Sequence, residues 1–558
     1  MMDYGAVIYV AISCLLLPFF EWRQEYDGRA YPFIGLSALY AIYLLLGGYS
    51  LPYDNLTIAT ITLGLWLIAS LIWTQHPHSV HELFNWLSYL MLFSAARVLP
   101  IEIVLWCVFP VPVIFAVMQL YKQAFKINQP FFIFGNVSHN SAFMLSGLLA
   151  GLYLHSLIPQ SSPLSPQSFP LSPLLILSSI IGLAIITTKS KGSIIALLGT
   201  LLFMGVMLKS IFILSFMGTA VGLICLWLFK NRGHNWGVSG SLRERVLIFG
   251  AAWEILKEQP LFGHGLGMFK KMMPFAVTAL YKKKWFYKMI KARYPEYQNL
   301  PIFANKVHND HIETIVELGL IGYGLFVYLF LQMSFNIFSI GFLIMAVVVS
   351  SVFFYFRNTH TAVPFWAVMG GATGSSLSVL SPQSFPLSPQ SSVLFSPLSP
   401  LLILKLTGLL IIFTVISHTF RKLAGLAYFT NAALSPDIGK KLEFTQKAID
   451  CDPCNGDYLN YYAYNGFILK PQNSLFYTLR GLAVYDGSRQ IWGLWNILSR
   501  LIFSMDKLKI SEWAVNHALK AHPDYDEGKK MQNAIYTMRL LLSNKSEEAR
   551  ERWQHTSQ

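Results

Sequence analysis

The chain has 558 residues, of which 54% are hydrophobic and only 13% are charged. A soluble globular protein carries about 25% charged residues, so this composition argues against a soluble chain and favours a membrane protein. Much of the formal net charge of +14 lies in one loop and the C-terminal tail, which indicates anionic headgroups or phosphorylated lipids, and not nucleic acid, as partners.

Apolar runs near the length that crosses a bilayer, about 20 residues, recur along the chain. They predict an all-α polytopic membrane protein with about twelve to thirteen transmembrane helices. The predicted spans are 5–21, 32–50, 56–74, 84–98, 101–120, 140–158, 174–188, 192–208, 210–229, 319–335, 337–356, 362–379 and 400–418. The first run lacks a basic flank and a small-residue cleavage site, so it is interpreted as a spanning helix and not as a cleaved signal.

This pattern divides the chain into four parts. They are transmembrane helices at 1–229, a large hydrophilic loop at 230–318, further transmembrane helices at 319–418 and a soluble helical domain at 419–558. The segment SPQSFPLSP occurs identically at 165–173 and 381–389. Its prolines break helices, so both copies are interpreted as linkers between spans, the alternative being a docking motif.

The tail after Thr419 shows a helical repeat. Similar segments begin at Ala448, Ala483 and Ala518, 35 residues apart, and they resemble tetratricopeptide repeats, whose period is about 34. Such stacked helix pairs present a binding surface, so a protein partner is expected there; an irregular helical tail is the alternative. The CxxC of Cys451 and Cys454 is interpreted either as a pair without function or as a disulfide or thiol pair.

The densest group of polar residues lies where the loop meets the next span, in HNDHIETIVELGLIG at 308–322. Residues three or four apart share a helix face, as do His308 and His311, or Glu313 and Glu317. Polar groups at a membrane boundary are costly unless they are paired or used, which marks this block as a candidate site. An HxxH pair is compatible with a metal, but no third ligand at conventional spacing is evident, so no metal and no cofactor are expected.

The block resembles the signature of the O-antigen ligase and O-antigen polymerase superfamily, with His-Asn, a Glu nine residues later and then two glycines. Three other segments are similar to the same family. They are Arg245 followed by PLFGHGLGMF at 260–269, TKSKG at 188–192 with Lys191 where the family has Arg, and GNVSHN at 135–140. The span count places all four segments on one side of the membrane, as a shared site requires.

The resemblance implies a multi-pass enzyme of the bacterial inner membrane that moves a glycan from an undecaprenyl pyrophosphate donor to an acceptor hydroxyl. In that interpretation His308 takes the hydroxyl proton, Arg245 holds the leaving pyrophosphate, and Glu317 completes the catalytic set. Cationic side chains then supply the charge that a metal would supply. The expected substrate-binding residues are Asn136, Lys189, Lys191, Arg243 and Asn309.

The acceptor is open, because ligation to a lipid, polymerisation of repeat units and transfer to protein share these motifs. A transporter or flippase of lipid-linked sugars is an alternative from another class, but paired repeats and mid-span charges typical of transporters are not evident. A scaffold is a third interpretation, and it leaves the block at 308–322 unexplained. Basic residues in short loops, such as Arg23 and Lys122, favour a cytoplasmic long loop. The resemblance implies an extracytoplasmic one, and this is the orientation we expect.

Overall fold

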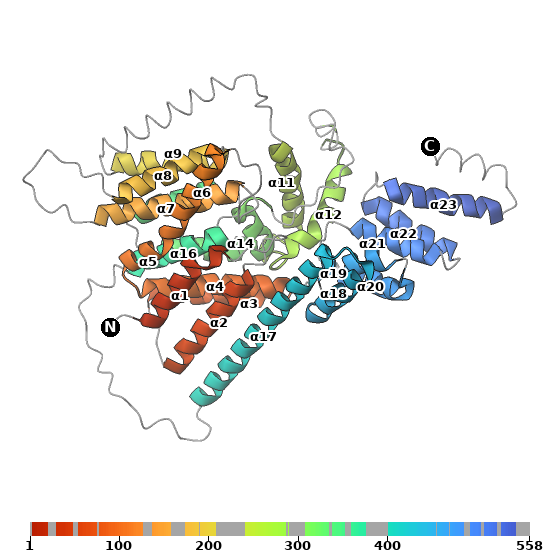
Figure 1. The fold of residues 1–558 in the computed structure, drawn as a ribbon, viewed down its shortest axis with the longest axis horizontal. Helices are drawn as coiled ribbons and strands as arrows, with labels where there is room; N and C mark the ends of the chain where they lie inside the picture. Colours follow the sequence, from red (N-terminus) through yellow and green to blue (C-terminus); the bar gives the residue numbers. More distant parts are fainter. Residues whose placement is uncertain are drawn as a thin grey trace, which may run out of the picture.

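The structure is a computed structural model, and its description is confined to the following residues. These are 3–19, 30–47, 54–74, 78–125, 137–157, 173–188, 190–207, 240–285, 288, 307–333, 337–351, 356, 359–374, 400–453, 455–467, 469–484, 491–503, 507–521 and 526–542. Every regular element in these ranges is a helix and none is a strand, which confirms the all-helical class expected from the sequence (Figure 1).

Helices from both sides of the hydrophilic loop form a helical bundle. Its elements are α1 (Tyr4–Leu15), η1 (Leu17–Phe19), α2 (Ala30–Gly47), α3 (Asn55–Ser70), α4 (His78–Arg97), α5 (Ile101–Val108), α6 (Pro110–Ala124), α7 (Val137–Leu157), α8 (Pro173–Thr187), α9 (Lys191–Met207), α14 (Asp310–Leu331), α15 (Ile337–Ser350), α16 (Thr359–Gly374) and α17 (Pro400–Leu434). The hydrophilic loop contributes α11 (Gly240–Glu258) and α12 (Met268–Tyr281). The tail contributes α18 (Ile438–Cys451), α19 (Gly456–Gly466), α20 (Pro471–Val484), α21 (Ile491–Phe503), α22 (Leu508–Ala521) and α23 (Asp526–Leu542).

Three helical segments among the described residues are long and apolar enough to cross a membrane: Ile101–Ala124, Asp310–Leu331 and Thr407–Leu434. Shorter apolar helices coincide with several other predicted spans, so these helices are those of a membrane protein while the count of spans stays a prediction. The predicted span at 210–229 lies outside the described residues, as do both SPQSFPLSP segments apart from Pro173.

Two helices extend well beyond the apolar runs that predicted them. α14 begins at Asp310, before the predicted span at 319–335, and α17 continues to Leu434, beyond the predicted end at 418. Hydropathy does not register these extensions because their extra turns carry polar residues, yet they remain helical through packing against neighbouring elements. The predicted boundary at 318 falls next to Gly319, where α14 is interrupted, and the boundary at 418 falls within α17; the domain division stays a prediction.

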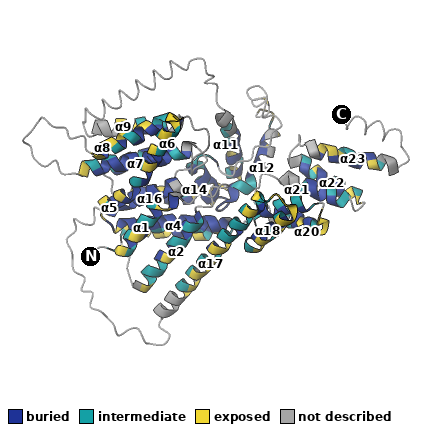
Figure 2. Ribbon diagram, viewed as in Figure 1, coloured by how far each residue is buried: buried dark blue, intermediate teal, exposed yellow. Residues whose placement is uncertain are grey.

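The bundle core is aromatic. The rings of Trp86, Phe326 and Trp366, from α4, α14 and α16, meet in edge-to-face arrangements with centroids 5.9–6.4 Å apart. All three side chains are buried, and such ring pairs stabilise a core beyond the area they bury. In Figure 2 the helices at the centre of the bundle, such as α4 and α16, are coloured mostly as buried. Close backbone approach accompanies this packing, because a Cβ on Gly370 of α16 would lie 2.3 Å from the carbonyl oxygen of Phe93 in α4.

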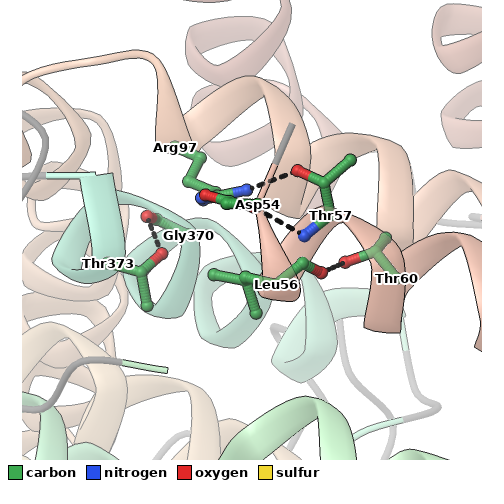
Figure 3. Close-up of polar contacts among 7 residues, drawn as sticks. All are labelled: Asp54, Leu56, Thr57, Thr60, Arg97, Gly370 and Thr373. Carbon is green, nitrogen blue, oxygen red and sulfur yellow. Dashed lines mark hydrogen bonds and ion pairs between the residues drawn. The ribbon is translucent and has the colours of Figure 1, made fainter. Parts of the chain in front are cut away.

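One end of the bundle is closed by a polar clasp, which we define as Asp54, Thr57 and Arg97 (Figure 3). Asp54 caps α3 by accepting a hydrogen bond from the Thr57 backbone N–H at 2.8 Å, and its other carboxylate oxygen pairs with the Arg97 guanidinium. Arg97 also donates to the Thr57 hydroxyl at 2.9 Å. The clasp joins the start of α3 to the end of α4, so we call this the clasp end.

The opposite end of the bundle holds the hydrophilic loop. Thr74, beyond the C-terminus of α3, and Ser79, at the start of α4, both lie against residues of the loop: a Cβ on Gly265 would fall 1.7 Å from Thr74 Oγ1, and Ser79 donates a hydrogen bond to the Leu266 carbonyl. Because α3 and α4 run antiparallel, these residues are a helix length away from the clasp. We call this the loop end.

α17 connects the bundle to the tail. It packs antiparallel to α2, with Gly408 beside Leu45 and Thr419 beside Gly35. Beyond the bundle its last turns enter the tail, where Phe429 contacts Tyr458 with ring centroids 4.7 Å apart. α17 therefore leaves the bundle at the loop end, and the tail helices lie beside α12, which contacts α22 (Figure 1).

Candidate functional site

The candidate site is built on a small apolar cluster at the loop end. α11, α12 and the start of α14 bury a shared set of side chains against one another. Its members include Leu247, Ile248, Phe269, Val307 and Val316. Arg245 lies two residues before Leu247, and His308 directly follows Val307, so burial of these apolar neighbours brings the two predicted site residues together.

His308 is held in an unusual backbone conformation next to Arg245. Its φ of 58° makes it the one non-glycine residue with positive φ among the described positions. Residues in this left-handed region are uncommon and cluster at functional sites, where the surrounding structure imposes the conformation. Burial, together with the positive charge of Arg245, lowers the pKa of His308 to about 4. The imidazole is therefore neutral at pH 7 and is able to accept a proton.

The residues after His308 fix the helix start that presents it. Asn309 is the N-cap of α14: its side-chain oxygen accepts from the Ile312 N–H at 2.9 Å, and its amide nitrogen donates to the Ser351 carbonyl at 3.1 Å. Asp310 accepts from the Phe356 N–H at 2.6 Å, and Glu313 accepts from the Val307 N–H at 2.8 Å. These contacts satisfy backbone donors at the helix start and just before it, and they lock the conformation of the segment that carries His308.

His311 does not join His308 in a shared site. Its Nδ1 lies 3.2 Å from the Tyr323 hydroxyl and its Nε2 lies 2.8 Å from the Ser350 hydroxyl. Both ring nitrogens are thus engaged by α14 and α15, which gives His311 a packing role. No group of three or more His, Cys, Asp or Glu side chains in the described ranges has the arrangement of a metal site. Metal independence stays a prediction.

The segment Pro260–Gly265 is inserted into a break in α14. Gly319, with φ 72° and ψ 179°, interrupts the helix, so the N–H groups of Leu320 and Ile321 lose their acceptors within it. They donate instead to the carbonyls of Pro260 and Leu261, at 2.9 and 3.2 Å. In exchange, the N–H groups at 264 and 265 donate to the carbonyls at 316 and 317, at 3.0 and 2.7 Å. The two segments thereby satisfy each other's backbone groups, and we call this contact the seam.

Glycine is required at the seam for two reasons. Gly263, Gly265 and Gly319 all have positive φ, a conformation that side-chain-bearing residues rarely adopt. There is also no room for a side chain, since a Cβ on Gly263 would lie 2.4 Å from the Glu317 carbonyl oxygen and one on Gly319 would lie 2.1 Å from the Leu261 carbonyl oxygen. The glycines of PLFGHGLG and ELGLIG are therefore complementary parts of one joint.

Side chains from the bundle anchor the seam. The indole N–H of Trp66, in α3, donates to the Leu318 carbonyl at 3.2 Å, and its ring stacks on Phe262 with centroids 5.8 Å apart. On the loop side, the His264 ring hydrogen-bonds the Ile255 carbonyl of α11 at 2.8 Å. The seam therefore couples α11, which carries Arg245, to α14, which follows His308.

Glu317 is buried at the seam, where its carbonyl receives the Gly265 N–H. It is seven residues after Asp310, roughly 10 Å along the axis at 1.5 Å per residue. Glu317 and His308 therefore occupy different levels of the site. A direct catalytic role for Glu317 stays a prediction, and its position is that of a residue supporting the joint between loop and helix.

The TKSKG turn reaches the same end of the bundle. Ser193, in the first turn of α9, hydrogen-bonds Ser141 near the start of α7 at 2.7 Å. α7 runs antiparallel to α6, because Phe143 packs on Phe115 and Gly151 lies beside Phe109, so α7 begins at the loop end. α15 ends there, where Ser350 contacts His311, so α7 and α15 are antiparallel, with Tyr153 stacked on Phe338 at 4.4 Å. Ser141 is 12 residues before Tyr153 and Ser350 is 12 residues after Phe338, so the α9 start lies at the level of Ser350, which contacts His311.

Four predicted binding residues are described only in part or not at all. Asn136 and Lys189 lie outside the described residues. Lys191 begins α9 and Arg243 lies in the first turn of α11, but their side chains are outside the described ones. The backbone nevertheless places Lys191 and Arg243 at the loop end, together with Arg245 and His308.

Sequence reasoning missed the residues that receive the loop. Trp66, Thr74 and Ser79 come from predicted spans or their edges, and nothing in their local sequence marks them as partners of a segment almost 200 residues away. The glycine spacing at 263, 265 and 319 was the available signal for the seam, because repeated glycines beside polar residues indicate close backbone approach.

Comparison with known families finds a match over the segment that holds the candidate site. A family model described as O-antigen ligase matches residues 175–327, a stretch that runs from α8 into α14 and contains Lys191, Arg245, the seam and His308. The match supports the O-antigen ligase superfamily and, in general, glycosyl transfer of the ligase or polymerase type. No curated protein matches the chain.

Proposed function

We propose that the chain transfers a glycan from an undecaprenyl pyrophosphate donor to an acceptor hydroxyl, with His308 as the base and Arg245 as the pyrophosphate ligand. The observation that carries this proposal is the half-buried imidazole of His308, held at positive φ beside the Arg245 guanidinium at one end of an apolar helical bundle. A lipid-linked pyrophosphate needs an apolar surface for its chain and cations for its head, and both are available there.

The reaction is a displacement at the anomeric carbon of the donor sugar. The acceptor oxygen forms the new bond to that carbon as its proton passes to the imidazole of His308. The bond from the anomeric carbon to the pyrophosphate oxygen breaks, and undecaprenyl pyrophosphate leaves with the electron pair. Arg245 stabilises the charge that grows on the leaving oxygen, and its planar fork suits a bidentate contact with phosphate.

Through Arg245, donor binding changes the pKa of His308. In the free protein Arg245 helps to lower the pKa of His308 to about 4, which makes the imidazole a weak base. A pyrophosphate bound to Arg245 offsets that positive charge, so the pKa of His308 rises toward the range in which a general base works best at neutral pH. Proton transfer is thereby favoured when the donor is present.

The test is transfer of glycan from a lipid pyrophosphate donor in liposomes. His308→Ala should lower transfer about 10²- to 10⁴-fold, the usual contribution of a general base, while donor binding persists. Arg245→Ala should weaken donor binding and turnover together, and Arg245→Lys should restore them only partly because the bidentate geometry is lost.

A matched control is His155→Ala, since His155 lies in the last turn of α7, toward the clasp end. That variant should transfer at the wild-type rate. Transfer by a well-folded His308→Ala protein at a rate near that of His155→Ala would remove the catalytic role and favour the transporter interpretation.

The acceptor remains a matter of proposal. Lipid, growing glycan and protein acceptors all offer a hydroxyl, and ligase and polymerase chemistry use the same donor and base. The assay distinguishes them when each acceptor is supplied separately with one donor, because the bond that forms differs while dependence on His308 should not.

A further inference from the structure

The tail carries a cluster of aromatic rings on α21 and α22, apart from the aromatic core of the bundle. Trp495 of α21 meets Trp513 and His517 of α22, with ring centroids 5.2 and 4.8 Å away, and Trp513 lies 4.5 Å from His517. Trp513 is 50% exposed although it is large and apolar. Trp495 and His517 are half-buried beside it, so the rings form a partly open aromatic face, which is a candidate contact surface.

Planar polar side chains flank these rings. Asn516, one turn after Trp513, accepts a hydrogen bond from the Gln532 amide of α23 at 3.0 Å. The remaining polar atoms of that amide pair are the Asn516 nitrogen, a donor, and the Gln532 oxygen, an acceptor. Glu512 and Arg539 form an ion pair at 2.5 Å along the same two helices. Donors and acceptors therefore border the ring cluster on α22 and α23.

The cluster is held in place by its own contacts. His517 Nδ1 lies 2.9 Å from the Trp513 carbonyl, one helical turn earlier, which restrains the imidazole ring beside the indole. α21 and α22 are joined below it by reciprocal Ser499 and Ser511 hydrogen bonds, with both hydroxyls buried. The rings thus sit on a rigid helix pair, and a rigid surface loses little entropy when it binds a ligand.

We propose that Trp495, Trp513 and His517, together with Asn516 and Gln532, form a glycan-binding platform that holds the polysaccharide chain handled at the loop end. A pyranose ring presents a face of C–H groups that stacks on an indole, and a rim of hydroxyls that pairs with amides. An aromatic face bordered by planar polar groups matches both features. This inference rests on the proposed function for its substrate class, but it assigns a second site, in the tail.

The position of the platform fits that role. The helix that carries Trp513, α22, is also the tail helix that contacts α12, and α12 shares an apolar cluster with α11, the helix of Arg245. The tail therefore lies beside the loop element that is packed against the helix of Arg245. Binding there would keep a long acceptor or product near the site and raise its local concentration.

The test is binding of delipidated bacterial O-polysaccharides to the full-length protein in lipid nanodiscs, measured on a biosensor. We expect at least one polysaccharide to bind, Trp513→Ala to weaken it about tenfold, as loss of one stacking ring does, and Asn516→Ala to weaken it several-fold. Tyr464→Ala is the matched control, because Tyr464 is an exposed tail aromatic, 68% accessible, on α19. Its affinity should stay within about twofold of wild type.

Two further arms separate this inference from the proposed function. His308→Ala should bind polysaccharide like wild type, so platform-dependent binding without any transfer would contradict the proposed function alone. Transfer that depends on His308, with polysaccharide binding absent or equal in wild type and Trp513→Ala, would overturn the platform alone. Trp513-dependent binding of a protein or of bare vesicles, without glycan binding, would likewise overturn it. If Trp513→Ala unfolds in a melting assay, the polysaccharide affinities of Trp513→Tyr and Asn516→Ala are measured instead. Affinities equal to that of wild type in both variants would overturn the platform.

Discussion

The two ends of the helical bundle are held together by different kinds of contact. At the clasp end, the Asp54 N-cap and its ion pair with Arg97 hold α3 against α4 (Figure 3). At the loop end, α14 is broken, several glycines hold positive φ, and His308 adopts a conformation that few side chains tolerate. Among the described residues, every positive φ lies at the end that we propose for chemistry.

The largest effect is expected from closing the break in α14. Gly319→Ala should destabilise the protein by more than about 3 kcal/mol, because φ is 72° and the new Cβ would meet the Leu261 carbonyl. Gly324→Ala is the matched control in the same helix, since a Cβ there meets nothing within 4 Å. Thermal melting in detergent measures both variants. Equal melting temperatures would show that the seam is not a tight joint.

The clasp should matter for stability and not for transfer. Arg97→Ala leaves the carboxylate of Asp54 without its partner at a half-buried position, so the expected loss of stability is about 1–3 kcal/mol. Transfer per folded molecule should remain at the wild-type level, since the clasp is a helix length away from His308. Glu102→Gln, at an exposed position in α5, is the control for charge removal. A large fall in turnover of folded Arg97→Ala would contradict the division between the two ends.

The pH dependence of the loop end follows from His308. Its pKa in the folded protein, about 4, is below the ordinary value of 6.5 because of burial and then Arg245. Between those values the unfolded chain binds a proton that the folded one does not, so His308 lowers stability as pH falls from 6.5 toward 4. Its base form persists over that window, and kcat/KM, which reports the free enzyme, should keep its acidic limb near 4.

Arg245→Gln separates the two causes of that pKa. Removing the charge should raise the pKa of His308 only partly, because burial, the larger cause, remains. The acidic limb of the residual activity should therefore move upward, and melting temperature should fall less steeply between pH 6.5 and 4. An unchanged limb would mean that Arg245 does not act on His308 electrostatically.

Features that depend on neighbouring residues could be predicted from the sequence, whereas features that depend on contacts between distant segments could not. The all-helical class, the block at 308–322 and the pairing of Arg245 with His308 were accessible, because composition, local motifs and a family resemblance carry them. The helical turns that precede the apolar run of α14 and follow that of α17 carry polar residues, so hydropathy alone does not delimit these two helices. The HxxH spacing suggested a shared face, but positive φ at His308 turns the two imidazoles to different surroundings.

The hydrogen-bond partners in the seam could not be predicted from the sequence. The four hydrogen bonds that join Pro260–Gly265 to α14 connect segments more than fifty residues apart, and backbone partners leave no trace in side-chain periodicity. Glycines at 263, 265 and 319 indicate a tight backbone but not its partner. The sequence thus indicates which residues form such a joint, but only the structure shows which backbone groups they contact.

The smallest effect is expected from the anchor that ties the seam to α3. The Leu318 carbonyl lies at the break, where the Trp66 indole N–H donates to it at 3.2 Å. Trp66→Phe keeps a ring beside Phe262 and Trp73 but removes that donor, so stability should fall by about 0.5–1.5 kcal/mol, the usual net value of one hydrogen bond. Transfer should fall only a few-fold, because the glycine contacts of the seam remain.

Trp106→Phe is the control, since Trp106 is an exposed indole of α5 far from the seam. Melting curves and transfer rates of the two variants measured side by side decide the point: equal losses would reduce Trp66 to a lipid-facing ring, whereas a loss confined to Trp66→Phe would show that α3 helps to hold the joint on which His308 depends.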